Sequence, residues 1–162
     1  MQRKSTITFC GGAGMVTGAN FLFDIGGQKI LIDCGLTQEG HGVHAKNIDF
    51  TYDPRDIDVL IVTHAHADHI GKIPKLVRDG FDGVIFSTKA TRDLSAVMFD
   101  DALRILTEEA DELGVAPLYA REDIVHTMRL WRGIDYHHPF VLGDGATARF
   151  LDAGHILGSA MV

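Results

Sequence analysis

Residues 57–63 form an almost continuous run of apolar and β-branched side chains, Ile-Asp-Val-Leu-Ile-Val-Thr. Such a run is typical of a central strand that is covered on both faces of a sheet. Three of the nine histidines in this chain of 162 residues follow the run at once, in the order His64-Ala65-His66-Ala67-Asp68-His69. The chain must therefore fold so that a buried strand delivers these side chains to one edge of a sheet.

The rest of the sequence alternates strand patterns with helix patterns. Further strands are expected at residues 6–9, 19–25, 28–33 and 83–87, with a hairpin over 140–142 and 146–152 and a last strand around 158–162. Helices are expected at residues 74–79, 94–113 and 124–131, and residues 34–54 are expected to form a long loop. The Gly26-Gly27 pair predicts a tight turn between the second and third strands. This order of elements predicts a single α/β unit.

Composition excludes several classes of protein. No run of eighteen apolar residues is present, so a membrane span is not expected. The net charge of −7 is unsuited to holding a polyanion by overall electrostatics. The only cysteines, Cys10 and Cys34, are too few for a disulfide framework, and no apolar leader precedes the first strand. We therefore expect a cytoplasmic protein.

The residue types between His64 and His69 are those that hold divalent metal ions. Imidazole nitrogens and carboxylate oxygens are ligands suited to zinc. In a tight loop His64 and His66 can converge on one ion, while Asp68 and His69 face a second one. His155, flanked by Gly154 and Gly158, is a candidate for the third histidine of the first site. The alternatives are a solvated histidine-rich turn and, for His155, an ordinary turn histidine.

Asp33 ends the strand expected at residues 28–33. A carboxylate there could accept the second N–H of a ligand imidazole, or a bound water, and so fix the orientation of that ring. The alternative is a plain aspartate in a turn. Three cations that follow the histidines, Lys72, Lys75 and Arg78, could contact phosphates or could form a solvated helix face. Of the remaining histidines, His41, His44 and His126 are expected on the surface, and nothing in the sequence directs His137 and His138, which precede Pro139, to the site.

These motifs resemble a known family. The pattern His64-x-His66-x-Asp68-His69 is the signature of the metallo-β-lactamase superfamily, in which Asp33 resembles the first motif and His155 the third. Residues 11–18 and 152–160 are similar to the RNA-processing β-CASP branch, which includes the nuclease subunit of the eukaryotic mRNA 3'-end cleavage complex and related prokaryotic RNases.

The resemblance implies an α/β fold, the N-terminal half of an αββα sandwich, and a hydrolase that is an RNA-processing endo- or exonuclease with two zinc ions. It implies that His64, His66 and His155 hold one zinc, that Asp68 and His69 bind the other, and that a hydroxide oriented by Asp68 attacks a phosphodiester. Asp33 would accept a hydrogen bond from a ligand imidazole and so fix the orientation of that ring. RNA is the implied partner, and self-association into a homo-oligomer is compatible with the sequence.

Several parts of the family pattern have no counterpart in residues 1–162. They are the bridging aspartate, a further histidine, the β-CASP insert and the second half of the sandwich. Residues 1–162 are therefore expected to be a partial domain with little nuclease activity alone. Two alternatives stay open, a hydrolase of a small thioester or lactam and a non-catalytic metal-binding module. A dinucleotide site at Gly12-Ala13-Gly14 is disfavoured because a strand, and not a helix, is expected to follow those glycines.

Overall fold

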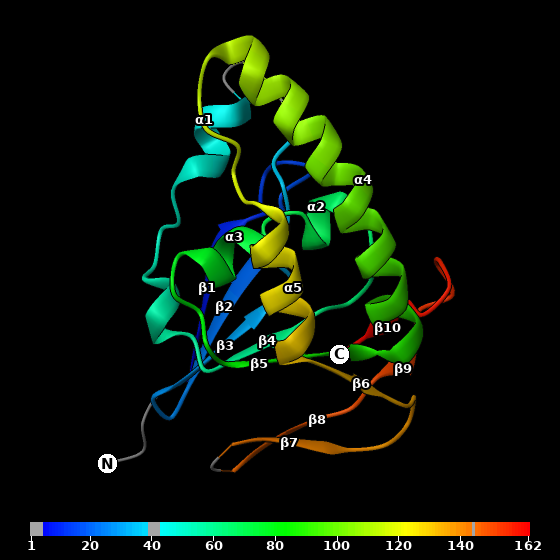
Figure 1. The fold of residues 1–162 in the computed structure, drawn as a ribbon. Coiled ribbons are helices and arrows are strands. Elements are labelled where there is room, and N and C mark those ends of the chain that lie inside the picture. Colours follow the sequence, from blue (N-terminus) through cyan, green and yellow to red (C-terminus); the bar gives the residue numbers. More distant parts are fainter. Residues whose placement is uncertain (1–4, 39–42, 144) are drawn as a thin grey trace.

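A six-stranded mixed sheet forms the centre of the computed structural model, which describes residues 5–38, 43–143 and 145–162 (Figure 1). His41 lies outside these ranges. The strands follow one another in chain order across the sheet: β1 (Thr6–Gly11), β2 (Asn20–Ile25), β3 (Gln28–Ile32), β4 (Val59–Ile61), β5 (Val84–Thr88) and β6 (Trp131–Ile134). β1, β2 and β3 pair antiparallel, and β3 to β6 pair parallel.

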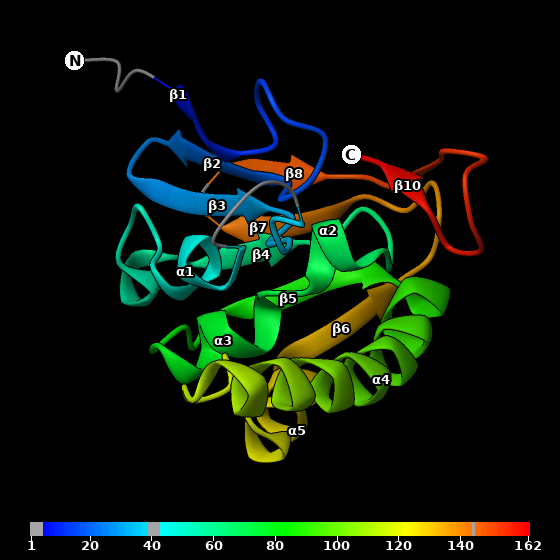
Figure 2. The ribbon, with the colours of Figure 1, turned by 90° about the horizontal axis from the view of Figure 1, so that it is seen from above.

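The remaining elements cover the two faces of this sheet. The helices are α1 (Val43–Ile48), α2 (Ala67–Ile70), α3 (Ile73–Arg78), α4 (Lys89–Leu113) and α5 (Arg121–Leu130), with a 3-10 turn, η1 (Pro54–Asp56). Two small antiparallel pairs are formed by β7 (Phe140–Gly143) with β8 (Ala146–Ala148) and by β9 (Leu151–Asp152) with β10 (Ala160–Met161). Helices α3, α4 and α5 lie on one face of the sheet, and β7 and β8 lie on the other (Figure 2).

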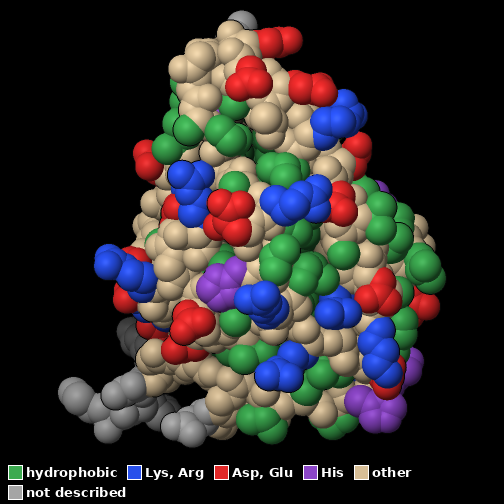
Figure 3. All heavy atoms as spheres, viewed as in Figure 1, with side chains coloured by type: hydrophobic (Ala, Val, Ile, Leu, Met, Phe, Trp, Pro, Cys, Tyr) green, Lys and Arg blue, Asp and Glu red, His purple; other side chains and the backbone are tan. Residues whose placement is uncertain are grey.

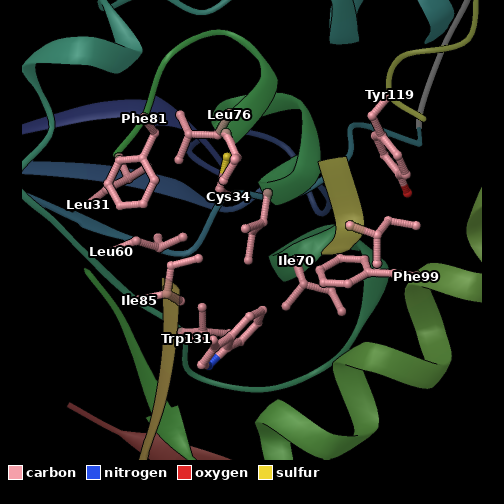
Figure 4. Packing of buried hydrophobic residues seen from close by; sticks show 14 of the residues in the cluster. Leu31, Cys34, Leu60, Ile70, Leu76, Phe81, Ile85, Phe99, Tyr119 and Trp131 are labelled. Atoms are coloured by element: carbon pink, nitrogen blue, oxygen red, sulfur yellow. The ribbon is translucent and has the colours of Figure 1, made fainter. Parts of the chain in front are cut away.

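Alternate residues of the central strands face opposite sides, so both faces of the sheet are buried. Leu31, Leu60 and Ile85 belong to the cluster on the helix side, which also contains Phe99 and Trp131 (Figure 4). Their neighbours on β3 and β4 belong to a second cluster on the opposite side: Ile30, Val59 and Ile61, packed with Phe150. The continuous apolar run of residues 57–63 is explained by this two-sided burial, because neither face of β4 meets solvent.

Most expected elements are confirmed, including the strand that leads into the histidines and the Gly26-Gly27 hairpin. The long helix α4 ends as expected at Gly114, which has a left-handed φ of 67°. It begins five residues earlier than its apolar periodicity indicated, with Thr88 as its N-cap. None of the helices in the described ranges is both long enough and apolar enough to cross a membrane.

Two expectations are wrong in part. Residues 34–54 contain helix α1, which the Asn47 side chain secures through hydrogen bonds to the backbone N–H and C=O of Thr37. Trp131 begins β6 instead of ending α5, because its indole Nε1 donates to Ser87 Oγ at 2.8 Å and its backbone pairs with β5. In both places a side-chain contact outside the element itself decides the local structure.

The two cysteines are unpaired and differ in environment. Cys34 is fully buried, and burial raises the pKa of its thiol to about 12, whereas Cys10 is half-buried. Since the thiolate is the reactive form, a thiol reagent at about pH 8 is expected to label Cys10 and to spare Cys34 in the folded chain. Mass spectrometry of labelled peptides tests this, with urea-unfolded chain as the fully labelled control. Equal labelling of both thiols in the native state would contradict the burial of Cys34.

Candidate metal centre

The histidine-rich segment forms the tight connection between β4 and α2. His64 comes three residues after β4, His66 is the N-cap of α2, and Asp68 and His69 lie within that helix. The third motif reaches the same place because Ala160 N, on β10, donates to Thr63 O at 2.9 Å. His64 and His155, which are 91 positions apart in the chain, are thereby held close together at one edge of the sheet.

Three imidazoles from these two segments meet around one point. Each of His64, His66 and His155 offers a nitrogen, and these ligand atoms all lie within 4.8 Å of one another. His155 Nε2 is 3.2 Å from His66 Nδ1. Two nitrogens bound to one tetrahedral zinc at its usual bond length are about 3.4 Å apart. The spacing of the three histidines therefore fits a metal ion, with one coordination position left for water or substrate.

The loop of His155 is fixed by buried hydroxyl groups. Ser159 Oγ accepts hydrogen bonds from the backbone N–H of His155 at 3.1 Å and of Ile156 at 3.2 Å. Thr88 and Thr91, at the N-terminus of α4, both donate to Gly158 O, at 2.7 and 2.8 Å. His155 is itself exposed, so its position depends on the anchoring of its own loop.

Asp33 lies behind the histidines and is 1% exposed. Its Oδ1 accepts from Thr63 N at 2.8 Å, and its Oδ2 accepts from Thr63 Oγ1 at 2.7 Å and lies 2.7 Å from His69 Nδ1. The φ angle of Asp33 is 59°, in the left-handed region that aspartate tolerates better than most residues. A buried carboxylate is thus fully engaged by the segment that carries the histidines.

Asp68 and His69 form a second group of donors. His69 Nε2 lies 3.6 Å from Asp68 Oδ2, and both side chains are about a quarter exposed. Within the described part of the chain, the histidine triad is the only set of three such side chains close enough to share an ion. Asp68 and His69 therefore offer two ligands for a second ion, and no described residue supplies a third.

The pKa values of His64 and His69 are shifted in opposite directions. Burial, and the neighbouring His69, His66 and His155, lower the pKa of His64 to about 4. Burial also acts to lower the pKa of His69, but the hydrogen bond and charge of Asp33 and the charge of Asp68 outweigh it, so this pKa is raised. His64 is therefore neutral at physiological pH, which is the state that binds a metal ion.

The main chains of the two motif segments are in direct contact at Gly35. Cys34 N donates to His69 O at 2.8 Å and Leu36 N to Ala67 O at 3.0 Å, so residues 34–36 lie against α2. A Cβ atom on Gly35 would lie 1.6 Å from Asp68 O and 2.7 Å from His69 N. Only glycine allows this approach, which places Asp33 against the histidine segment.

Gly35→Ala is expected to lower the free energy of unfolding by about 3 kcal/mol, because the clash is with backbone that cannot move away. Gly114→Ala is the matched control: its added Cβ meets nothing within 4 Å but takes a left-handed φ, which costs about 1 kcal/mol. Urea denaturation of both variants measures the difference. An equal loss of stability in the two would contradict the close approach at Gly35.

Two of the three cations that follow the histidines are placed differently from both expectations, whereas Arg78 is exposed. Lys72 and Lys75 are buried, and Lys72 Nζ donates to Asp49 O at 3.2 Å and lies 4.3 Å from the centroid of the Phe50 ring. Arg78 donates to the backbone C=O of Pro117 and Leu118. Lys72 and Lys75 therefore form neither a phosphate-binding patch nor a solvated face, and Arg78 joins the exposed end of α3 to the loop before α5.

The other histidines stand apart from the triad. His126, His137 and His138 are exposed, and His44 is half-buried. Within the described ranges, none of them belongs to a group of side chains close enough to hold a metal ion. Thr63 is the contact residue that the sequence motifs did not single out. Its position immediately before the histidines, next to the strand that Asp33 ends, is the signal that would have pointed to it.

Comparison with known proteins identifies the domain. Residues 14–103, more than half of the chain, match the family described as the metallo-beta-lactamase superfamily. The chain belongs to this superfamily. Metallo-beta-lactamase domains are metal-dependent, in agreement with the spacing of His64, His66 and His155.

Two curated relatives of this metallo-beta-lactamase domain cover nearly all of it. Ribonuclease TTHA0252 from Thermus thermophilus is 36% identical over 94% of this chain and 33% of its own length. The transcription termination factor FttA from Methanocaldococcus jannaschii is 34% identical over 96% of this chain and 24% of its own length. The chain thus spans a quarter to a third of the relatives that it matches. Their names confirm the resemblance to RNA-processing proteins.

The fold agrees with solved structures of the superfamily. The archaeal metallo-beta-lactamase superfamily protein ST1585 from Sulfolobus tokodaii superimposes with a TM-score of 0.53 at 18% identity, over 92% of this chain and 55% of the other. The predicted α/β fold class, with strands and helices in the metallo-beta-lactamase arrangement, is confirmed.

Proposed function

We propose that the chain supplies the metal-binding part of an RNA phosphodiesterase, with zinc as its metal. The observation that carries the proposal is the convergence of His64, His66 and His155, which come from segments far apart in the sequence. The similarity to a ribonuclease over 94% of the chain supports RNA over a small thioester or lactam as the substrate.

Each polar residue of the site has a part in this proposal. His64, His66 and His155 would hold the first zinc, and Asp68 with His69 would contribute to a second. When bound, zinc supplies Lewis-acid stabilisation of the phosphoryl oxygens and activation of the attacking water. Asp68 would orient that water, and Asp33 would hold the His69 ring through Nδ1. Such supporting carboxylates are typical of catalytic metal sites.

The surface charge limits how RNA would be held. On the face seen in Figure 3, acidic and basic side chains are interspersed over α4 and α5, and the chain as a whole has a net charge of −7. Lys72 and Lys75 are buried and therefore not available to phosphates. We propose that the metal ions themselves, together with surfaces outside residues 1–162, neutralise the RNA backbone.

We further propose that residues 1–162 are the N-terminal portion of a larger catalytic unit, in which further residues complete the second metal site and the sandwich. The coverage of 33% and 24% of two relatives supports this proposal. We also propose a cytoplasmic location, because two cysteines are too few for a disulfide framework.

Turnover of a single-stranded RNA and of a small thioester tests the function. Both substrates are offered, with zinc, to the 162-residue chain and to the chain extended by the sequence that follows it in its gene. We expect metal-dependent RNA cleavage by the extended form, abolished by Asp68→Ala, and little cleavage by residues 1–162. Preference for the thioester would overturn the RNA assignment, and robust cleavage by residues 1–162 would overturn the proposed incompleteness.

A further inference from the structure

The hydroxyl of Thr63 lies at the centre of the polar contacts behind the metal centre. Its Oγ1 is 2.7 Å from Asp33 Oδ2, 2.9 Å from His64 Nδ1 and 3.4 Å from His69 Nδ1. The backbone N–H of the same residue donates to Asp33 Oδ1 at 2.8 Å. Thr63 thus connects the carboxylate of Asp33 to the first histidine of the triad.

Counting donors and acceptors decides which way each proton points. An ionised carboxylate only accepts, so both partners of Asp33 Oδ2 must donate: the Thr63 hydroxyl and His69 Nδ1. A hydroxyl has one proton and two lone pairs, and the proton of Thr63 is used by Asp33. The 2.9 Å contact with His64 Nδ1 is then a hydrogen bond only if His64 Nδ1 is the donor.

We infer that Thr63 is a positioning residue. Its hydroxyl donates to the carboxylate of Asp33 and accepts from His64 Nδ1, and it thereby fixes His64 as the tautomer with its proton on Nδ1. The inference deepens the proposed function, on which it rests, because it assigns the ligand atom of His64. With Nδ1 protonated, the lone pair of Nε2 is free to face the triad. Asp33 then sets the tautomers of two histidines, His69 directly and His64 through the Thr63 hydroxyl.

The environment of His64 makes this assignment consequential. The residue is 9% exposed, so water has little access to replace a lost partner of Nδ1. A neutral imidazole exchanges its proton freely between the two nitrogens unless one tautomer is favoured by a hydrogen bond. Without the Thr63 hydroxyl, most of the population would carry the proton on Nε2, and these molecules cannot bind a metal through this atom.

Two variants separate the hydroxyl from the shape of the side chain. Thr63→Val keeps the branched shape and removes the hydroxyl, whereas Thr63→Ser keeps the hydroxyl. The direct readout is the long-range ¹H–¹⁵N NMR spectrum of the imidazoles in the zinc-free chain, at a pH where His64 is neutral. This spectrum distinguishes a protonated from an unprotonated Nδ1. A purely structural role of Thr63 would not change it.

We expect the Nδ1-protonated tautomer of His64 in the wild-type chain and in Thr63→Ser, and mainly the Nε2-protonated tautomer in Thr63→Val. Zinc affinity, measured by competition with a chromophoric chelator, is expected to fall about 10–100-fold in Thr63→Val and to stay close to wild type in Thr63→Ser. Circular dichroism checks that each variant is folded.

A His64 proton on Nε2 in the wild-type chain would overturn the inference, and so would wild-type zinc affinity in a folded Thr63→Val chain. If Thr63→Val does not fold, the tautomers of the wild-type chain and of Thr63→Ser still decide. None of these measurements uses RNA. Absence of RNA cleavage together with the expected tautomers would therefore refute the proposed function and leave the inference standing.

Discussion

His64→Ala, His66→Ala and His155→Ala are each expected to weaken zinc binding more than about 100-fold. In the proposed site the three rings share one ion, so the loss of any one removes a direct ligand, and the effect should exceed the roughly 10–100-fold loss typical of residues that only orient a ligand. The ligand atoms lie within 4.8 Å of one another, and the 3.2 Å contact joins His66 to His155. Competition with a chromophoric chelator measures each affinity.

His126→Ala is the matched control for these variants. His126 is exposed on α5 and belongs to no group of potential ligands in the described ranges, so its loss should leave zinc affinity unchanged. Loss of binding in only one or two of the three ligand variants would contradict the proposal that the three histidines bind one ion. Equal effects of His126→Ala and His155→Ala would show that zinc binds this chain nonspecifically.

Asp33→Ala is expected to lower the free energy of unfolding of the zinc-free chain by roughly 3–5 kcal/mol. Three donors lose their acceptor at once: Thr63 N, Thr63 Oγ1 and His69 Nδ1. The carboxylate is buried, and it is the acceptor for these donors in the native structure. The left-handed backbone at this position adds to the cost, because alanine tolerates it less well than aspartate.

Asp33→Asn separates the charge from the shape of this side chain. The amide keeps one acceptor oxygen and the tolerance of a left-handed φ, so we expect a loss of about 1–2 kcal/mol. Urea denaturation without zinc compares the two variants with the wild-type chain. A loss below about 1 kcal/mol in Asp33→Ala would show that the carboxylate is not the anchor of the histidine segment.

Local sequence was enough to predict the strand that leads into the site and the convergence of the two histidines that follow it, His64 and His66. The apolar run of residues 57–63 can be satisfied only by burial on both faces, and the spacing of His64 and His66 is short enough for one turn of chain to bring them together. His155 was harder to place, because its position depends on the pairing of β10 beside Thr63.

The wrong expectations share one physical cause. Helix α1, strand β6 and the buried Lys72 are all decided by partners outside the element concerned: Thr37 for Asn47, Ser87 for Trp131, and Phe50 for Lys72. Periodicity and residue type contain no information on such partners. The contacts of Thr63 were missed for the same reason, since a threonine at the end of a strand has no distinctive pattern.

The location of zinc bound to this chain tests the central claim most directly. Anomalous diffraction at the zinc edge, from crystals of the zinc complex, gives the position of the ion without any assumption about its ligands. We predict an ion about 2.0–2.1 Å from three imidazole nitrogens, one each from His64, His66 and His155. An ion bound elsewhere, or one that lacks any of these three nitrogens, would contradict the account.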